Sequence, residues 1–238
     1  MLPRVDVLAV VPAFQAERSV AAVVTGLLRE LPDHAGPRVV VVDDGSTDGT
    51  AAAAERAGAT VLRHSGNLGK GAALRSGMRF AETAGFGAVV TVDADGQHPA
   101  DEAARVALHP AAREALVLGV RDLRRDGAPW PNRFSNGFSN VFLSWFGGVE
   151  LHDSQCGLRR YPVPDTLALA ARSDGYAFEA ETLLRAARLG WQIAELPVRV
   201  VYPPPTEHVS HFHGVRDPAR IVFRVLETTW SVPRKAKI

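Results

Sequence analysis

The sequence contains a single cysteine, Cys156, in 238 residues. One cysteine excludes an intrachain disulfide framework and is typical of proteins from a reducing compartment. No apolar run approaches the roughly 18 residues that a membrane-spanning helix needs. The first 14 residues lack the pattern of a secretory signal peptide, because their apolar segment is short and ends in a turn. These absences predict a folded cytoplasmic protein.

The chain also has almost no net charge. Its 27 Lys and Arg residues offset 26 Asp and Glu residues, which leaves +1 at pH 7. Proteins that coat nucleic acid are usually strongly basic, so we expect no nucleic-acid partner. Two nucleotide-binding patterns are missing as well: the first predicted strand is followed neither by G-x-G-x-x-G nor by a P-loop. This argues against a dinucleotide oxidoreductase and a P-loop kinase.

What is present in the first half is an alternation of strand and helix patterns. We expect strands at 5–11, 39–42, 60–62, 88–92 and 115–119, and helices at 20–31, 70–84 and up to residue 57, the last one capped by Ser46 or Thr47. This alternation predicts an α/β fold with a mainly parallel sheet covered by helices on both faces. In such sheets, ligands bind beyond the carboxyl ends of the strands.

The second half is less regular. Helices are expected at 133–148, 176–189 and 217–230, and a strand at 192–201. Aromatic residues gather on one face of the first of these helices, at positions 134, 138, 142, 145 and 146. That face either packs on the sheet as core or lies at a membrane surface. The basic C-terminal end, with Arg234, Lys235 and Lys237, would favour contact with anionic lipid.

The most informative motif is DADGQHP at 93–99, directly after a predicted buried strand. Its Asp93, Asp95 and Gln97 offer the hard oxygen ligands that Mg²⁺ and Mn²⁺ favour. Such an ion can stabilise a diphosphate as a leaving group. A polar turn capped by aspartates would also explain the D-x-D triplet alone, but the preceding strand and the Gln-His-Pro that follows favour the metal.

A second acidic segment, VVVVDDGSTDGT at 39–50, follows another predicted strand. The carboxylates of Asp43 and Asp44 can accept hydrogen bonds from a nucleobase or a ribose. A strand end followed by a capped helix would account for the same residues. Both acidic segments follow strands of one parallel sheet, so we expect them at the same edge.

Four blocks in this order resemble family 2 glycosyltransferases: VVPAFQAE at 10–17, VVDDGSTDGT at 41–50, GNLGKGAA at 66–73 and DADGQHP at 93–99. Further similarity lies at 119–121, 153–159 and 175–181, so that the resemblance covers roughly residues 5–201. The sequence is most similar to the branch of dolichol-phosphate mannose synthases and polyprenyl-phosphate glycosyltransferases.

The resemblance implies a GT-A fold with a single Rossmann-like sheet, a nucleotide-diphosphate sugar donor and a divalent ion, Mg²⁺ or Mn²⁺. It places Pro12, Glu17 and either Asp43 or Asp44 at the nucleoside, and Asp93, Asp95 and Gln97 around the metal and the diphosphate. Ala13, beside Pro12, and Lys70, which opens a helix and could approach a phosphate, complete the predicted donor site. On the acceptor side the resemblance implies that Arg121 and Arg133 meet the phosphate of a lipid and that Asp153 is the catalytic base. Gln15 departs from the family, which usually has Asn there.

Elementary chemistry agrees with these roles but leaves alternatives open. A hydroxyl acceptor needs a carboxylate to take its proton, whereas a phosphate needs cationic partners such as the planar fork of arginine. Arg121 can equally form a salt bridge at a strand end, Asp153 can cap a turn, and Lys70 can point to solvent. A histidine cluster, His208, His211 and His213, forms either a loop that closes over the donor or a metal site.

The sequence therefore predicts a metal-dependent inverting glycosyltransferase that moves a sugar from a UDP- or GDP-sugar to a lipid-linked acceptor, polyprenyl phosphate. Alternatives are a hydroxyl acceptor with the same donor chemistry, or a non-catalytic membrane-surface protein of the same fold. The predicted location is cytoplasmic, with peripheral contact at the inner face of the membrane. The expected parts are a catalytic domain at 1–201, with a donor half at 1–119 and an acceptor half at 120–201, and a C-terminal region at 202–238.

Overall fold

The computed structural model describes residues 6–31, 36–128, 130–201 and 216–232. Its strands are β1 (Val7–Ala13), β2 (Val39–Asp43), β3 (Thr60–Arg63), β4 (Ala88–Thr91), β5 (Leu116–Arg121), β6 (Arg159–Pro162) and β7 (Ile193–Val198). Its helices are α1 (Val20–Glu30), α2 (Thr50–Arg56), α3 (Lys70–Thr83), α4 (Ala100–Ala107), α5 (Trp130–Gly147), α6 (Asp165–Ala168), α7 (Ala177–Arg188) and α8 (Arg216–Ser231).

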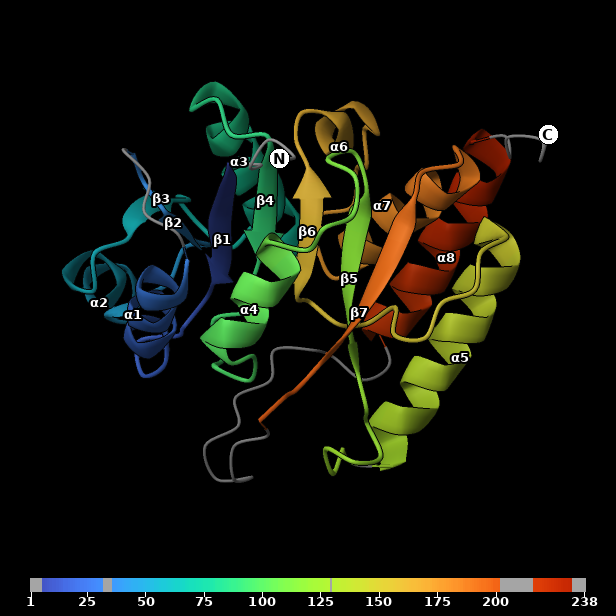
Figure 1. Ribbon diagram of the computed structural model, residues 1–238, viewed down its shortest axis with the longest axis horizontal. Helices are drawn as coiled ribbons and strands as arrows, with labels where there is room; N and C mark the ends of the chain where they lie inside the picture. Colours follow the sequence, from blue (N-terminus) through green and yellow to red (C-terminus); the bar gives the residue numbers. More distant parts are fainter. Residues whose placement is uncertain (1–5, 32–35, 129, 202–215, 233–238) are drawn as a thin grey trace.

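The strands form one seven-stranded sheet in the order β3-β2-β1-β4-β6-β5-β7, which Figure 1 shows across the middle of the molecule. Strand β6 runs antiparallel to both of its neighbours, β4 and β5. The other neighbouring strands pair in parallel. The predicted α/β class with a mainly parallel sheet is confirmed. The proposed division of the chain at residues 119 and 201 stays a prediction.

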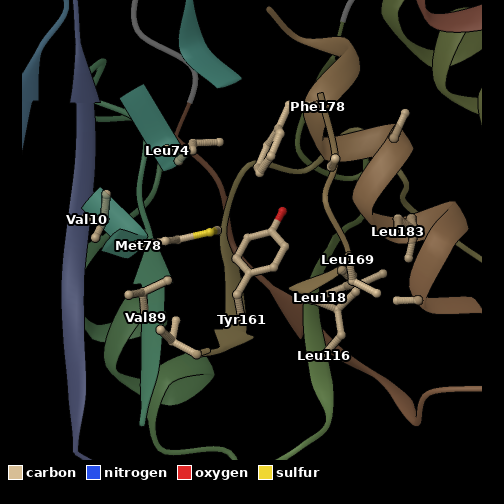
Figure 2. Close-up of a cluster of buried hydrophobic side chains, with 14 of the residues drawn as sticks. Val10, Leu74, Met78, Val89, Leu116, Leu118, Tyr161, Leu169, Phe178 and Leu183 are labelled. Atoms are coloured by element: carbon tan, nitrogen blue, oxygen red, sulfur yellow. The ribbon is translucent and has the colours of Figure 1, made fainter. Parts of the chain in front are cut away.

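Helices cover both faces of the sheet, and a separate apolar core lies under each layer. One core joins the sheet to α3, α5, α7 and α8, and the other joins it to α1, α2 and α4. Consecutive residues of β1 and β2 supply opposite cores, which is why both strands are almost continuously apolar. In the first core the ring of Tyr161 lies between Met78 of α3 and Leu118 of β5 (Figure 2).

Several local features differ from the expectations. The sequence patterns do not predict α4, α6 or β6. The expected cap of the second helix is wrong: α2 begins at Thr50, its N-cap position is Gly49, and neither Ser46 nor Thr47 occupies that position. Asp48 instead accepts a hydrogen bond from the backbone N–H of Thr50 at 3.0 Å. The free N–H at the start of α2 is therefore satisfied by a carboxylate two residues before the helix, and not by the Ser or Thr hydroxyl that the sequence predicted.

The aromatic helix α5 is partly core and partly surface. Leu143 is buried, and Phe142 and Phe146 pack against the first core. Phe134 and Trp145 are exposed, Trp145 by 77%. Packing as core therefore accounts for one side of this helix, and contact of its exposed side with a membrane stays a prediction. In the described parts of the chain, no helix is both long and apolar enough to cross a bilayer.

Candidate active site

The carboxyl ends of β1, β2 and β4 bring the predicted donor residues to one edge of the sheet. Pro12 and Ala13 end β1 opposite Val42 and Asp43 of β2, and Asp93 follows β4. The order of the strands reverses at this point, because β1 connects to β2 on one side while β4 lies on its other side. Crevices at such reversals are the usual ligand sites of open α/β sheets.

Gln15 joins the loop after β1 to the loop after β2. Its side-chain oxygen accepts hydrogen bonds from the backbone N–H groups of Thr47 and Asp48, at 3.0 and 3.2 Å. Its own backbone N–H donates to Ser46 Oγ at 2.9 Å. Glu17, on the same loop, is exposed, and its side chain lies against the Cα of Gly49. Gln15 thus ties together the two loops that the resemblance places around the nucleoside.

Asp44 anchors the segment that precedes α3 through hydrogen bonds. Its buried carboxylate accepts hydrogen bonds from the backbone N–H groups of Leu68 and Gly69, at 2.9 and 2.7 Å. His64 Nδ1 lies 2.7 Å from the same carboxylate. Asp43, also buried, accepts from the N–H of Ser46 at 3.0 Å. Both carboxylates therefore shape the loops of this edge, and Asp44 anchors the segment that leads to Lys70.

The Lys70 side chain is 14% exposed and lies between two carboxylates rather than pointing to solvent. Its Nζ lies 2.7 Å from Asp93 Oδ1 and 3.1 Å from Glu179 Oε2. The ring of Tyr176 adds a cation–π contact at 5.7 Å. Burial by itself would lower the pKa of Lys70, but the charges of Asp93 and Glu179 outweigh it and raise that pKa. The ammonium group is therefore charged and held in place at the strand end where Asp93 lies.

The environment of Asp93 favours its ionised form. Burial alone would raise the pKa of Asp93, but the charge of Lys70 and its hydrogen bond lower it. Gly157 passes so close that a Cβ there would collide with the Asp93 carboxylate. His98 lies nearby and is almost fully buried, and burial lowers its pKa to about 4. It is therefore neutral at neutral pH and adds no charge beside Asp93 and Lys70.

Asp95 and Gln97 occupy the turn beyond Asp93. Asp95 is exposed, and its Oδ1 accepts a hydrogen bond from the backbone N–H of Gln97 at 3.0 Å. No group of three His, Cys, Asp or Glu residues that could hold a metal occurs in the described segments. Mg²⁺ and similar ions often take one or two carboxylates and complete their shell with substrate phosphates and water. The carboxylates of Asp93 and Asp95 fit an ion completed in that way.

On the acceptor side, Arg121 and Asp153 form a bidentate ion pair. Arg121 Nε donates to Asp153 Oδ2 at 2.7 Å, and Nη2 donates to Oδ1 at 3.0 Å. Asp153 has no exposed surface. Arg133, in the first turn of α5, is half-buried, and its Nε is a buried donor without a hydrogen-bond partner. His208, His211 and His213 lie outside the described residues.

Two residues that contact Lys70 were not assigned to the site from the sequence. They are Glu179, whose carboxylate reaches Lys70, and Tyr176, whose ring lies under the ammonium group. Both fall in the segment 175–181, whose resemblance to the family gave them no role. The available signal was the Gly-Lys-Gly run at 69–71, because a glycine on each side of a lysine indicates a close backbone neighbour, and a buried ammonium requires carboxylates.

The family can be decided by comparison with known proteins. The model of glycosyl transferase family 2 matches residues 8–163. The chain belongs to this family. This glycosyltransferase is 31% identical over 229 residues to an uncharacterized protein of Methanocaldococcus jannaschii, with 93% of the chain and 91% of the relative covered. The predicted family is confirmed.

Two characterised relatives have names that specify a lipid phosphate. The undecaprenyl-phosphate mannosyltransferase of Micrococcus luteus is 33% identical over 215 residues, covering 82% of the chain and 83% of the relative. The polyprenol monophosphomannose synthase of Mycolicibacterium smegmatis is 30% identical over 210 residues, covering 82% and 77%. The glycosyltransferase thus falls in the polyprenyl-phosphate branch that the motifs indicated.

Solved structures confirm the GT-A fold. Glucosyl-3-phosphoglycerate synthase of Mycobacterium tuberculosis, crystallised with Mn²⁺, uridine diphosphate and phosphoglyceric acid, superposes with a TM-score of 0.70 at 20% identity, covering 94% of the chain and 78% of that structure. Mannosyl-3-phosphoglycerate synthase of Rubrobacter xylanophilus gives 0.65 at 22% identity, covering 95% and 73%. At these identities the likeness shows the fold.

Proposed function

We propose that this glycosyltransferase moves a sugar from a nucleotide-diphosphate sugar to a polyprenyl phosphate, with inversion at the anomeric carbon and with a divalent ion at the diphosphate. A phosphate oxygen of the acceptor forms a bond to the anomeric carbon, and the bond from that carbon to the donor diphosphate breaks. The observation that carries the acceptor class is the bidentate pair of Arg121 and Asp153. The names of the two characterised relatives support the same class.

A phosphate acceptor suits this pair better than a hydroxyl does. A catalytic base must reach the proton that it removes. Both oxygens of Asp153 are held by Arg121, and the carboxylate is fully buried. A phosphate is already anionic and needs no base. We therefore assign Asp153 the task of orienting Arg121, and Arg121 together with Arg133 the task of holding the acceptor phosphate.

On the donor side, Asp93, Asp95 and Gln97 would hold Mg²⁺ or Mn²⁺. When bound, that ion neutralises charge that develops on the leaving diphosphate. Lys70 keeps its positive charge beside Asp93 and offers a second cation to the diphosphate. Pro12, Ala13, Glu17 and the loops tied by Gln15 would enclose the nucleoside. The side chains of these loops would select the base and the sugar. We propose a UDP- or GDP-sugar as the donor.

We also propose that the enzyme meets its lipid at a membrane surface through α5 and α8. Arg188 connects the ends of the two helices, donating to the carbonyl oxygens of Phe146 at 2.8 Å and Thr229 at 3.1 Å, and Figure 1 shows the helices side by side. The exposed large apolar residues of the two helices, here called the α5–α8 apolar face, are Trp130, Phe134, Phe138, Val141, Trp145, Phe223, Leu226 and Trp230. Exposed aromatic residues spaced along one side of a helix are typical of interfacial helices.

Matched acceptors test the proposal. Purified enzyme with Mn²⁺ and each of UDP- and GDP-sugars is offered a short polyprenyl phosphate or the corresponding polyprenol. We expect sugar transfer to the phosphate and none to the alcohol, and loss of transfer when the ion is chelated. Transfer to the alcohol alone would replace the acceptor with a hydroxyl. Absence of donor binding in a thermal-shift screen with both nucleotides would favour the non-catalytic alternative.

A further inference from the structure

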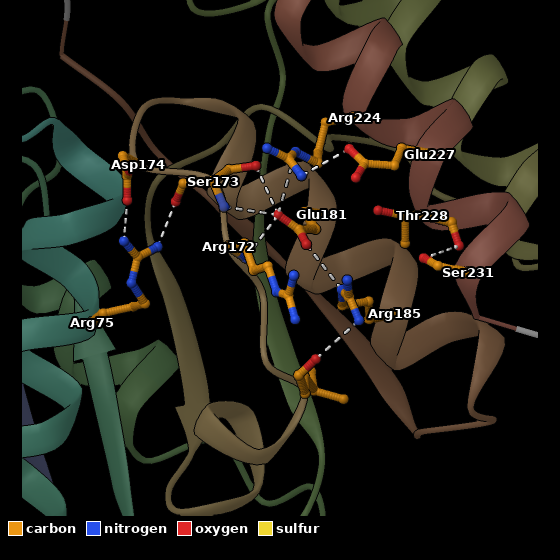
Figure 3. Close-up of polar contacts among 11 residues, drawn as sticks. Arg75, Arg172, Ser173, Asp174, Glu181, Arg185, Arg224, Glu227, Thr228 and Ser231 are labelled. Carbon is orange, nitrogen blue, oxygen red and sulfur yellow. Dashed lines mark hydrogen bonds and ion pairs between the residues drawn. The ribbon is translucent and has the colours of Figure 1, made fainter.

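A buried carboxylate of α7 holds a turn that lies against the start of α3. Glu181 has no exposed surface, and Figure 3 shows it among the polar groups of this turn. Its Oε2 accepts hydrogen bonds from the backbone N–H groups of Arg172 and Ser173, at 3.1 and 2.9 Å, and from Ser173 Oγ at 2.7 Å. Its Oε1 accepts from Arg185 Nε at 3.0 Å. Four donors thus converge on one side chain that the donor and acceptor chemistry does not use.

The charge of Glu181 suits this arrangement. Burial alone would raise the pKa of Glu181, but hydrogen bonds from Ser173 and Arg172 and the charge of Arg185 lower it. Arg224 of α8 adds a second guanidinium 3.9 Å away. An ionised carboxylate that accepts several N–H bonds is a strong and directional anchor. The segment 172–174 is therefore fixed relative to α7.

The same turn is also joined to α3. The backbone N–H of Ala72 donates to the carbonyl oxygen of Asp174 at 3.1 Å. Arg75 Nη1 donates to the carbonyl oxygen of Ser173 at 2.5 Å, and Nη2 bonds to the Asp174 carboxylate. The carbonyl groups of residues 173 and 174 lie so close to Gly69 and Gly71 that a Cβ at either glycine would collide with them. The turn therefore packs directly on the backbone that carries Lys70.

We propose that Glu181 is a positioning residue that acts through the turn 172–174 to hold the Lys70 ammonium between Asp93 and Glu179. Glu181 fixes the turn, the turn fixes residues 69–71, and these residues set the origin of the Lys70 side chain. The expected effect of Glu181 on donor binding rests on the proposed donor role of Lys70. The structural content of the inference, the placement of one amine by a carboxylate other than its two ion-pair partners, is independent of that role.

Lysine acylation tests the placement directly. The lysines of the chain are Lys70, Lys235 and Lys237, so Lys70 labelling by isotopic acetic anhydride is read by mass spectrometry against the other two in the same sample. We expect slow labelling of Lys70 in the unaltered protein. In Glu181→Gln and in Ser173→Ala, which removes only one bond to the turn, we expect Lys70 to label at least about threefold faster, because local opening exposes the amine.

Glu102→Gln is the matched control. Glu102 is likewise a buried glutamate paired with two arginines, Arg105 and Arg199, but it lies on α4 and does not touch the turn. Its substitution should leave Lys70 labelling unchanged. A folded Glu181→Gln or Ser173→Ala protein whose Lys70 labels at the original rate overturns the inference. Should Glu181→Gln not fold, Ser173→Ala decides.

A double-variant comparison separates positioning from general stability. Calorimetric titration measures the Kd of a nucleoside diphosphate in the presence of Mn²⁺. Glu181→Gln should raise this Kd at least about threefold in the native background. In a Lys70→Ala background it should leave the Kd unchanged, because the two substitutions act on one contact. Equal losses in both backgrounds would contradict the inference. A different outcome is faster Lys70 labelling in Glu181→Gln together with a Kd that changes neither in Glu181→Gln nor in Lys70→Ala. That result would exclude the donor role of Lys70, but it would still support the placement of Lys70 by Glu181.

Discussion

Arg121 and Asp153, which lie 32 positions apart in the chain, share three hydrogen bonds. Two join the guanidinium to both carboxylate oxygens, and the backbone N–H of Arg121 adds a third at 3.1 Å. Arg121 ends β5, whereas Asp153 precedes β6. The direction of the guanidinium is therefore fixed before a ligand arrives, which reduces the cost of ordering it around a phosphate.

This relationship predicts how acceptor use responds to Arg121→Lys. A lysine keeps the charge but loses the planar fork, so kcat/KM for polyprenyl phosphate should fall at least about tenfold, the loss of one hydrogen bond to a charged group. The Kd for the nucleotide should stay within about twofold, because lysine preserves the positive charge that acts on Asp93. Steady-state kinetics and calorimetry measure the two effects. A selective loss of donor affinity would contradict the assignment of Arg121 to the acceptor.

Asp95 should be dispensable for folding and necessary for metal-dependent donor binding. Its side chain is exposed, so Asp95→Ala should change the free energy of unfolding by less than about 0.5 kcal/mol. The rise in Tm that Mn²⁺ adds to the effect of a nucleoside diphosphate should disappear in this variant. Asp101→Ala, another exposed acidic residue of the same segment, is the control and should keep the rise. Full metal-dependent stabilisation in Asp95→Ala would exclude Asp95 as a ligand.

The buried His98 predicts a loss of stability in mild acid. Burial lowers its pKa to about 4, below the ordinary value of 6.5, so the unfolded chain binds a proton that the folded protein excludes. This penalty is absent above pH 6.5 and grows as the pH falls toward 4, up to about 3 kcal/mol of unfolding free energy. Urea unfolding of the metal-free protein at several pH values measures it.

A His98→Gln variant should flatten that dependence between pH 6.5 and 4. His152 provides the control, because Glu195 raises the pKa of this exposed histidine and its contribution has the opposite sign. His152→Gln should therefore steepen or preserve the loss of stability in acid. Identical pH profiles for the unaltered protein and His98→Gln would show that His98 does not cause the loss.

The α5–α8 apolar face predicts binding to vesicles. Trp230 is 90% exposed and Trp145 is 77% exposed. Replacing either with serine should weaken sedimentation with anionic vesicles about tenfold, corresponding to the partial burial of one large aromatic side chain. Leu108→Ser alters an exposed apolar residue directly after α4, outside this face, and should have no effect. Equal binding by all of these proteins would refute the membrane role of the face.

Much of the fold could be predicted from the sequence because its signals are local. The apolar runs of β1, β2 and β4 and the glycines that follow helices define the alternation of strands and helices. The sequence did not predict strand β6, because its first residues, Arg159 and Arg160, are charged and are typical of an exposed segment. Both are buried and donate to backbone carbonyl groups, Arg159 to that of Ser154 and Arg160 to that of His109, each at 2.7 Å. The acceptors of Arg160 lie about 50 residues away in the chain, which no local pattern can supply.

The candidate site divides in the same way. The motifs identified Asp93 and Lys70 separately, because each belongs to a conspicuous block. Their ion pair depends on the packing of α3 against the end of β4, and the contribution of Glu179 depends on the packing of α7 against α3. The orientation of Arg121 likewise depends on a carboxylate that reaches it only after β6 has entered the sheet. Spacing along the chain can assign residues to an edge, but it cannot pair charges that come from different elements.

The antiparallel direction of β6 has a consequence for how such enzymes can diverge. Because β5 ends and β6 begins at the same edge of the sheet, the segment 122–158 leaves and re-enters the fold at neighbouring points. It includes α5 and ends with Asp153 and Gly157, while β1, β2 and β4 lie outside it. Changes in the length or composition of this excursion leave the pairing of the donor strands intact. The excursion is therefore a natural unit for grafting a new acceptor specificity onto an unchanged nucleotide-sugar scaffold.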